Sequence, residues 1–233
     1  MATRANLRVQ QISAWSGIAF AILYPIFWAW YGHARPPLPP TLSPAEVADF
    51  YITHRQDVLI GMTISAVVGA LWIPWTAQLA IIMRRIEGDE PVLALIQLIG
   101  GALTAWVLIF TPAIWVVAAY RPHLHPDVIQ SLSDTAYLTF ALTYAITTVQ
   151  AVAAGIAGLM DKSADRVFPR WVCWFAILAG VSFFVVSFLP FHMTGPLAMN
   201  GSIVSVVPGS CYFVWTLSMG YYMIRDANRR RRA

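Results

Sequence analysis

Charged residues are scarce in this sequence: Asp, Glu, Lys and Arg make up only 11% of its 233 residues, against 58% hydrophobic residues. A soluble domain has about 25% charged residues, because its exterior must be solvated. The shortage therefore excludes an ordinary soluble domain, and the hydrophobic content excludes a disordered chain. The mean hydropathy of +0.63 is typical of an integral membrane protein.

Cysteine and lysine are nearly missing as well. Cys173 and Cys211 are the only cysteines and lie in apolar runs, so the sequence has neither a disulfide framework nor a cysteine-rich zinc or iron–sulfur site. The only lysine, Lys162, lies in a short polar connection, which excludes a retinal Schiff base inside the membrane. P-loop, dinucleotide-binding, Gly-x-Ser-x-Gly and His-Glu-x-x-His motifs are also missing, so no common enzyme class is indicated.

Six segments contain no Asp, Glu, Lys or Arg over a length sufficient to cross a bilayer. A helix needs about 20 apolar residues to cross ~30 Å of hydrocarbon, and in lipid the backbone must satisfy its own hydrogen bonds. We therefore predict an all-α integral membrane bundle of six transmembrane helices, forming a single domain over residues 1–233. The predicted helices cover residues 12–31, 58–83, 92–120, 135–160, 171–191 and 203–224.

A short amphipathic helix is predicted outside the six crossings, over residues 44–56. In the run Ser43-Pro44-Ala45-Glu46, serine suits the N-cap, proline the first helical position, and glutamate closes a capping box. Val47, Phe50 and Tyr51 then recur on one face, which favours a helix lying on the outer surface of the bundle.

The basic residues predict the orientation. If the N-terminus is cytoplasmic, 12 of the 15 Lys and Arg lie on the cytoplasmic side, and only Arg35, Arg55 and Arg121 lie outside. Positive charge is concentrated in this way on the cytoplasmic side of membrane proteins. We therefore expect a multi-pass protein with both termini in the cytoplasm. The same placement explains the pI of about 9.3, so no nucleic acid partner is expected.

Four crossings carry an interior proline: Pro25, Pro74, Pro112 and Pro208. Each proline removes one backbone hydrogen bond and bends its helix. Two interpretations stay open, namely packing kinks and a broken helix that lines a cavity.

Two groups of residues are candidates for binding a lipophilic ligand. The fourth crossing carries a polar stripe whose members share one helix face, and two tryptophans flank Pro74 at a depth where they could wall an apolar pocket. Packing alone is the alternative for both groups. The six candidates are Trp72, Trp75, Thr139, Thr143, Thr147 and Gln150.

The predicted topology places all five histidines outside. His54 and Asp57 are three residues apart, so they share a helix face, and the carboxylate can fix the tautomer of the imidazole as a general base or a ligand requires. Arg55 adjoins them, and Asp134 heads the fourth crossing at a similar depth. We therefore take these four residues as catalytic candidates. A charge network that ties helix ends together is the alternative.

Candidate metal ligands are His123 and His125, in a His-x-His run between two prolines. If that run is extended, both imidazoles point the same way, and if it is polyproline-like, they do not. A solvated loop is the alternative. A haem near the outer surface, held by His33, His54 or His192, also stays open, whereas no histidine lies in the middle of a crossing to ligate a buried haem. The cofactor is not assigned by the sequence.

Several short runs give the chain a resemblance to known proteins. They are Phe50-Tyr51 with His54-Arg55, Arg84-Arg85-Ile86-Glu87-Gly88, Tyr120-Arg121-Pro122, Phe168-Pro169-Arg170-Trp171, and Gly195-Pro196 with Asn200-Gly201. With these runs the chain resembles a group of uncharacterised bacterial membrane proteins with six crossings. The resemblance covers most of the chain and implies the six-helix fold and a bacterial cytoplasmic (inner) membrane, but no activity and no site residues.

Three functions are compatible with these observations. The first is binding of a lipophilic small molecule or lipid, or service as an accessory subunit of a membrane complex, with membrane lipids, a partner membrane protein or a second copy of the chain as partners. The second is a membrane-embedded enzyme with a His/Asp site on the extracytoplasmic face, either with or without a metal or haem. The third is a small transporter. We rank the first highest because a catalytic signature is missing.

Overall fold

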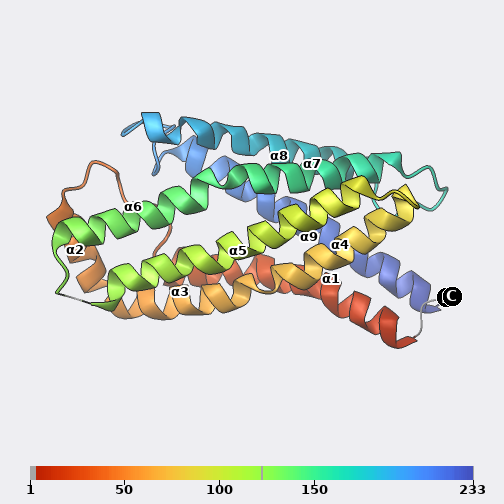
Figure 1. The fold of residues 1–233 in the computed structure, drawn as a ribbon, viewed down its shortest axis with the longest axis horizontal. Coiled ribbons are helices and arrows are strands. Elements are labelled where there is room, and N and C mark those ends of the chain that lie inside the picture. Colours follow the sequence, from red (N-terminus) through yellow and green to blue (C-terminus); the bar gives the residue numbers. More distant parts are fainter. Residues whose placement is uncertain (1–3, 122, 233) are drawn as a thin grey trace.

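A computed structural model describes residues 4–121 and 123–232, and within them every regular element is a helix. The six helices long and apolar enough to cross a membrane run along the longest axis of the molecule (Figure 1). They confirm the all-α membrane bundle and extend past most of the predicted ends into polar flanks. The six spans cover residues 5–31, 55–87, 92–120, 126–160, 170–191 and 202–231.

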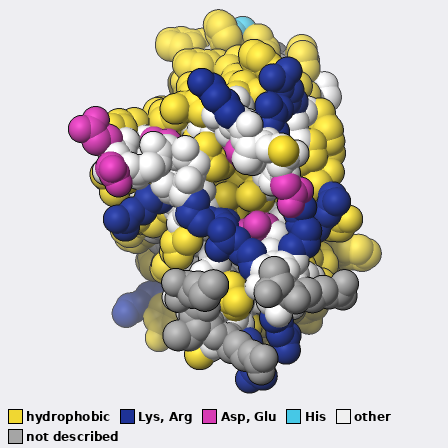
Figure 2. Space-filling view, turned by 90° about the vertical axis from the view of Figure 1, so that its right-hand side faces the viewer, with side chains coloured by type: hydrophobic (Ala, Val, Ile, Leu, Met, Phe, Trp, Pro, Cys, Tyr) yellow, Lys and Arg dark blue, Asp and Glu magenta, His cyan; other side chains and the backbone are white. Residues whose placement is uncertain are grey.

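Both ends of the chain lie at the same end of the bundle, here called the terminal end (Figure 1). The opposite end holds the segments that carry the five histidines and is called the histidine end. Figure 2 views the terminal end and shows Lys and Arg side chains gathered on it. There Asp226 pairs with Arg85, with 2.7 Å between carboxylate and guanidinium, and Asp165 pairs with Arg229. The protein is thus a multi-pass bundle with asymmetric charge.

Four of the six spans are interrupted near the middle or change there from an α-helix to another helix type. The spans α5 (Val92–Tyr120) and α9 (Ser202–Arg232) are continuous α-helices. In every case the half nearer the terminal end is a regular α-helix. The four divided spans are α1 (Arg4–Tyr24) with the π-helix η1 (Pro25–Tyr31), α3 (Arg55–Gly69) with α4 (Trp72–Glu87), α6 (Pro126–Leu142) with α7 (Tyr144–Met160), and α8 (Arg170–Ser182) with the 3₁₀-helix η2 (Phe183–Phe191).

Proline explains part of this division. Pro25 is the first residue of η1. Because proline has no N–H, it cannot donate the α-helical hydrogen bond, and the helix changes its pattern at this residue. Pro74 lies in the first turn of α4, just after the break. Pro112 and Pro208, in contrast, lie inside continuous helices. The break at Thr143 involves no proline: its hydroxyl donates to the carbonyl oxygen of Thr139 at 2.8 Å, a bond that competes with the helical pattern.

The predicted capping box is present at the start of α2 (Pro44–Thr53), which ends three residues before the predicted end. The Ser43 amide donates to the Glu46 carboxylate at 2.8 Å, and the Ser43 hydroxyl accepts from the Glu46 amide. The apolar face of α2 packs on the bundle, since the buried Tyr51 donates to the Ser133 hydroxyl of α6 at 3.0 Å. Pro126 is the first residue of α6.

Small residues let the helices approach closely in the half nearer the terminal end. A Cβ on Gly155 of α7 would lie 2.6 Å from the Cys173 carbonyl oxygen of α8. Between α4, α5 and α7, the buried Thr76 hydroxyl accepts from the side-chain amides of Gln97 (2.7 Å) and Gln150 (3.0 Å). This half of the bundle therefore combines close backbone contact with a buried polar centre.

Candidate functional site

A cavity of about 140 Å³ lies in the half of the bundle nearer the histidine end. Its wall is mostly apolar and comes from α1, η1, α5, α6, α7, η2 and α9. It coincides with the irregular backbone, because Thr143 at the α6–α7 break, Phe183 at the start of η2 and Pro208 inside α9 all line it. Helices that leave their regular path cannot pack closely along their whole length, and the space between them stays open.

Three polar groups on this wall have no polar partner within residues 4–121 and 123–232. They are the indole N–H of Trp28, the hydroxyl of Tyr212 and the guanidinium of Arg35. Trp28 and Tyr212 are buried, with 6% and 7% of their surface exposed. Arg35 is half-buried, with its guanidinium 5.9 Å from the centre of the Trp28 ring. A buried donor without a partner costs free energy, which a ligand that accepts from it would recover.

Hydrogen bonds hold the backbone at Arg35. The Tyr137 hydroxyl donates to the Ala34 carbonyl oxygen at 2.8 Å, and the Arg35 amide donates to the Ala29 carbonyl oxygen at 3.2 Å. Burial lowers the pKa of the guanidinium below its ordinary value, and the nearby Tyr137 acts in the opposite direction. Arginine nevertheless stays charged in proteins, so a positive charge lies at the edge of an apolar cavity.

Only some of the predicted ligand-binding residues line the cavity. Thr143 and Thr147 line the cavity, and Thr147 shares a hydrogen bond of 3.1 Å with Thr104 on the same wall. Thr139 does not line it, and Gln150 is fully buried against Thr76. The stripe on the fourth crossing therefore faces the bundle, as predicted, but only its middle reaches the cavity.

Trp72 and Trp75 lie in a fully buried aromatic cluster next to the cavity. Their rings stack with centroids 4.3 Å apart, and Trp72 stacks on Tyr212 at 5.0 Å. Of the rings in contact with Trp72 or Trp75, only Tyr212 also lines the cavity. The two tryptophans therefore support the wall from behind instead of lining it. Sequence reasoning missed Arg35, Trp28 and Tyr212, although Arg35 is one of only three basic residues that break the predicted charge asymmetry.

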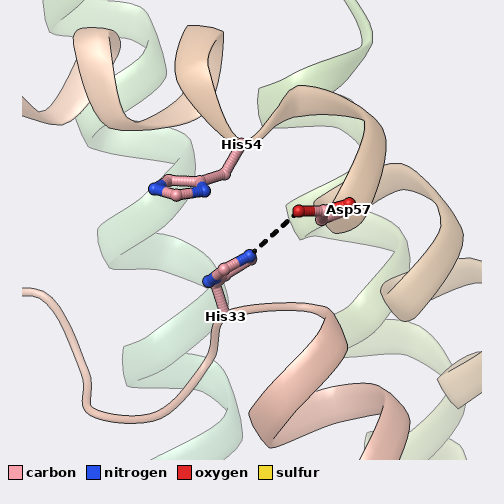
Figure 3. A group of neighbouring side chains, drawn as sticks. All are labelled: His33, His54 and Asp57. Carbon is pink, nitrogen blue, oxygen red and sulfur yellow. Dashed lines mark hydrogen bonds and ion pairs between the residues drawn. The ribbon is translucent and has the colours of Figure 1, made fainter.

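A second feature lies at the histidine end, where His33, His54 and Asp57 meet (Figure 3). Their potential ligand atoms all lie within 4.8 Å of one another, and all three residues are half-buried. The His33 Nε2 atom is 3.3 Å from the Asp57 carboxylate, and the two imidazole rings are 4.2 Å apart between centroids. The partner of Asp57 is thus His33, not His54 as the spacing along the helix predicted.

Two glycines bring His33 to Asp57. A Cβ on Gly61 of α3 would lie 2.4 Å from the amide nitrogen of Gly32, the residue that follows η1. With only hydrogen at this position, the end of η1 rests directly on α3. Asp57 lies one turn before Gly61 and hence on the same face of α3. His33 follows Gly32 and is therefore placed beside Asp57.

The other two catalytic candidates do not join this group. Arg55 points to the end of α5, where its guanidinium donates to the carbonyl oxygens of Ala119 (3.1 Å) and Tyr120 (2.8 Å). Asp134 lies on α6 with an exposed side chain, and the three-residue group does not include it. The catalytic assignment of the four residues stays a prediction, with Arg55 already engaged in capping α5.

His123 and His125, the predicted metal ligands, are exposed. His125 is the N-cap of α6, where its Nδ1 atom accepts from the Asp127 amide at 3.4 Å and lies 3.1 Å from the Asp127 carboxylate. Among the described residues, neither histidine belongs to a group of three possible metal ligands. His192 is half-buried, and its Nδ1 atom lies 2.9 Å from the Phe188 carbonyl oxygen.

Comparison of the chain with protein-family models, with curated proteins and with solved structures finds no match.

Proposed function

We propose that this protein binds an amphipathic, lipid-soluble carboxylate, with its apolar part in the cavity and its head at Arg35. The observation that carries the proposal is a mostly apolar wall on which two buried donors, of Trp28 and Tyr212, have no partner, beside the Arg35 guanidinium, which forms no ion pair with a described residue. Specific ligand pockets in proteins have this composition, an apolar lining with a few polar groups that fix the orientation of the ligand.

The chemistry of the three groups favours an anionic head. A guanidinium pairs with a carboxylate through two parallel hydrogen bonds, and such a head would supply the partner that Arg35 lacks among the described residues. The indole of Trp28 can only donate, so it also suits an oxygen acceptor. A ligand of this kind would relieve the cost of several unsatisfied donors at once.

The size of the cavity limits what it holds. A cavity of about 150 Å³ accommodates one benzene molecule, so the 140 Å³ found here fits a single ring or the end of an alkyl chain. The remainder of a longer ligand would extend from the cavity between the helices. The excess of arginine at the terminal end supports placing that end in the cytoplasm, and the resemblance to bacterial six-helix proteins supports a bacterial cytoplasmic membrane. The ligand would then enter from the outer leaflet of the cytoplasmic membrane.

Native mass spectrometry of the protein released from membranes tests this proposal. We expect the chain to retain a small lipophilic acid, and the purified protein to bind a spin-labelled fatty acid. Arg35→Gln should weaken fatty-acid binding by at least about tenfold, which corresponds to one charge-assisted hydrogen bond. Arg121→Gln is the matched control, because Arg121 is an exposed arginine that does not line the cavity.

Each outcome of this experiment decides a part of the proposal. Equal binding by the native protein, Arg35→Gln and Arg121→Gln would overturn a carboxylate ligand. A retained molecule with a carbonyl but no acid, still held by Arg35→Gln and lost in Tyr212→Phe, would replace the carboxylate by a neutral acceptor. A chain that carries no small molecule and binds none of these probes would overturn the binding function.

A further inference from the structure

The group formed by His33, His54 and Asp57 has no role in the proposed cavity function, and its chemistry is that of a metal site. We propose that these three residues bind a divalent transition-metal ion, with Zn²⁺ as the representative occupant. Imidazole nitrogen and carboxylate oxygen are ligands that Zn²⁺ and its neighbours in the first transition row share. Two imidazoles disfavour Ca²⁺ and Mg²⁺, which prefer oxygen ligands.

The distances are compatible with an ion between the three side chains. Ligands at 2.0–2.2 Å from a tetrahedral ion lie about 3.4 Å from one another, and the His33 and Asp57 atoms are already 3.3 Å apart. The whole group lies within 4.8 Å, so a small rotation of the half-buried His54 side chain closes the site. Three protein ligands leave a coordination position for water, as in catalytic zinc sites.

The backbone holds both histidines in uncommon conformations. His33 has φ of +54° and is the only non-glycine residue with a positive φ in the described part of the chain. His54 lies between α2 and α3 at φ −100° and ψ 17°, in the sparsely populated bridge region. Such conformations cost free energy and concentrate at sites where a side chain must be aimed.

The surroundings leave the group free to bind a cation. Arg55, the nearest cation along the chain, is occupied with carbonyl oxygens of α5 and does not pair with Asp57. On one side the Phe50 ring packs against both imidazoles, with centroids 4.8 Å from His54 and 6.1 Å from His33. The site therefore has an apolar wall and a net negative charge when its carboxylate is ionised.

Metal titration of the full chain tests the site. The protein is purified without a polyhistidine tag, stripped with a chelator, and titrated with Zn²⁺ by calorimetry and with Co²⁺ by visible absorption. We expect one ion per chain, with Co²⁺ bands of a four- or five-coordinate site. His33→Asn is the decisive variant: asparagine also tolerates a positive φ, so the loop keeps its path while the imidazole is lost.

The expected pattern across variants is specific. His33→Asn, His54→Ala and Asp57→Asn should each weaken Zn²⁺ binding by more than about 100-fold, because losing a residue that only hydrogen-bonds to a metal ligand already costs up to about 100-fold. His125→Ala, which removes an exposed histidine from the same end, should bind like the native chain. Zn²⁺ should also raise the melting temperature of the native chain and not that of His33→Asn.

Three results would overturn the site. They are unchanged Zn²⁺ binding in His33→Asn, loss of binding in His125→Ala, and failure of the native chain to bind either ion. The last result would leave the group as a His33–Asp57 contact with packed rings and no ligand. All three are independent of the cavity, since the fatty-acid assay reports on Arg35 and can succeed or fail separately.

Discussion

The two halves of this bundle are built differently although they share the same six spans. In the half nearer the terminal end the helices are regular α-helices, and the buried Thr76 hydroxyl accepts from Gln97 and Gln150 between three of them. In the half nearer the histidine end the backbone passes through a π-helix, a 3₁₀-helix and two helix breaks. The cavity and the His33–His54–Asp57 group both belong to this second half.

The difference indicates that one half of the domain supplies most of the stability and the other half holds the candidate sites. Close packing of regular helices supplies stability, whereas irregular backbone costs stability and is retained where a site needs it. We therefore expect matched substitutions to have larger effects on stability in the half nearer the terminal end. The three pairs that follow test this comparison in protein without added ligand or metal.

The largest difference is expected for glycine to alanine. In Gly155→Ala the new Cβ would lie 2.6 Å from the Cys173 carbonyl oxygen, so α8 must shift, at a cost of about 1–3 kcal/mol or more. In Gly209→Ala the nearest atom is the end of the flexible Arg35 side chain at 3.1 Å, and alanine gains up to about 1 kcal/mol in helix propensity. Melting temperatures in detergent should fall clearly only for Gly155→Ala. Equal falls would contradict the comparison.

Carboxylates at the two ends give the second pair. Asp226 is buried and holds Arg85 at 2.7 Å and Arg230 at 3.5 Å, so Asp226→Asn should destabilise the protein by about 1–3 kcal/mol. The Asp57 side chain is 49% exposed beside His33, so Asp57→Asn should cost at most about 0.5 kcal/mol. Thermal unfolding at low and high salt measures both. A larger loss for Asp57→Asn would show that the histidine end is the more stable one.

The sequence predicted the fold because a long apolar run in lipid must form a helix to satisfy its backbone hydrogen bonds. It also predicted the α2 capping box, which depends on four consecutive residues. The helix change at Pro25 could be anticipated, but the break at Thr143 could not: threonine bonds its own turn in many continuous helices.

The His33–Asp57 pair shows the limit of local reasoning. Spacing along one helix paired Asp57 with His54, whereas the observed partner lies 24 residues earlier and arrives through the contact between Gly32 and Gly61. That contact depends on how η1 packs on α3, which is a tertiary property. Arg35 was visible as an exception to the charge asymmetry, but its position on the cavity wall depends on the path of the loop after η1.

The smallest difference is expected for threonine to valine. Thr76→Val removes the acceptor of two buried amides, from Gln97 and Gln150, whereas Thr147→Val removes one bond to Thr104, whose hydroxyl can turn to its own helix. At about 0.6 kcal/mol for each side-chain hydrogen bond between membrane helices, Thr76→Val should cost about twice as much. Unfolding in mixed micelles resolves this difference. If the two costs are equal, the hydrogen bonds of Thr76 contribute no more stability than the bond of Thr147. The stability of the half nearer the terminal end would then come from helix packing.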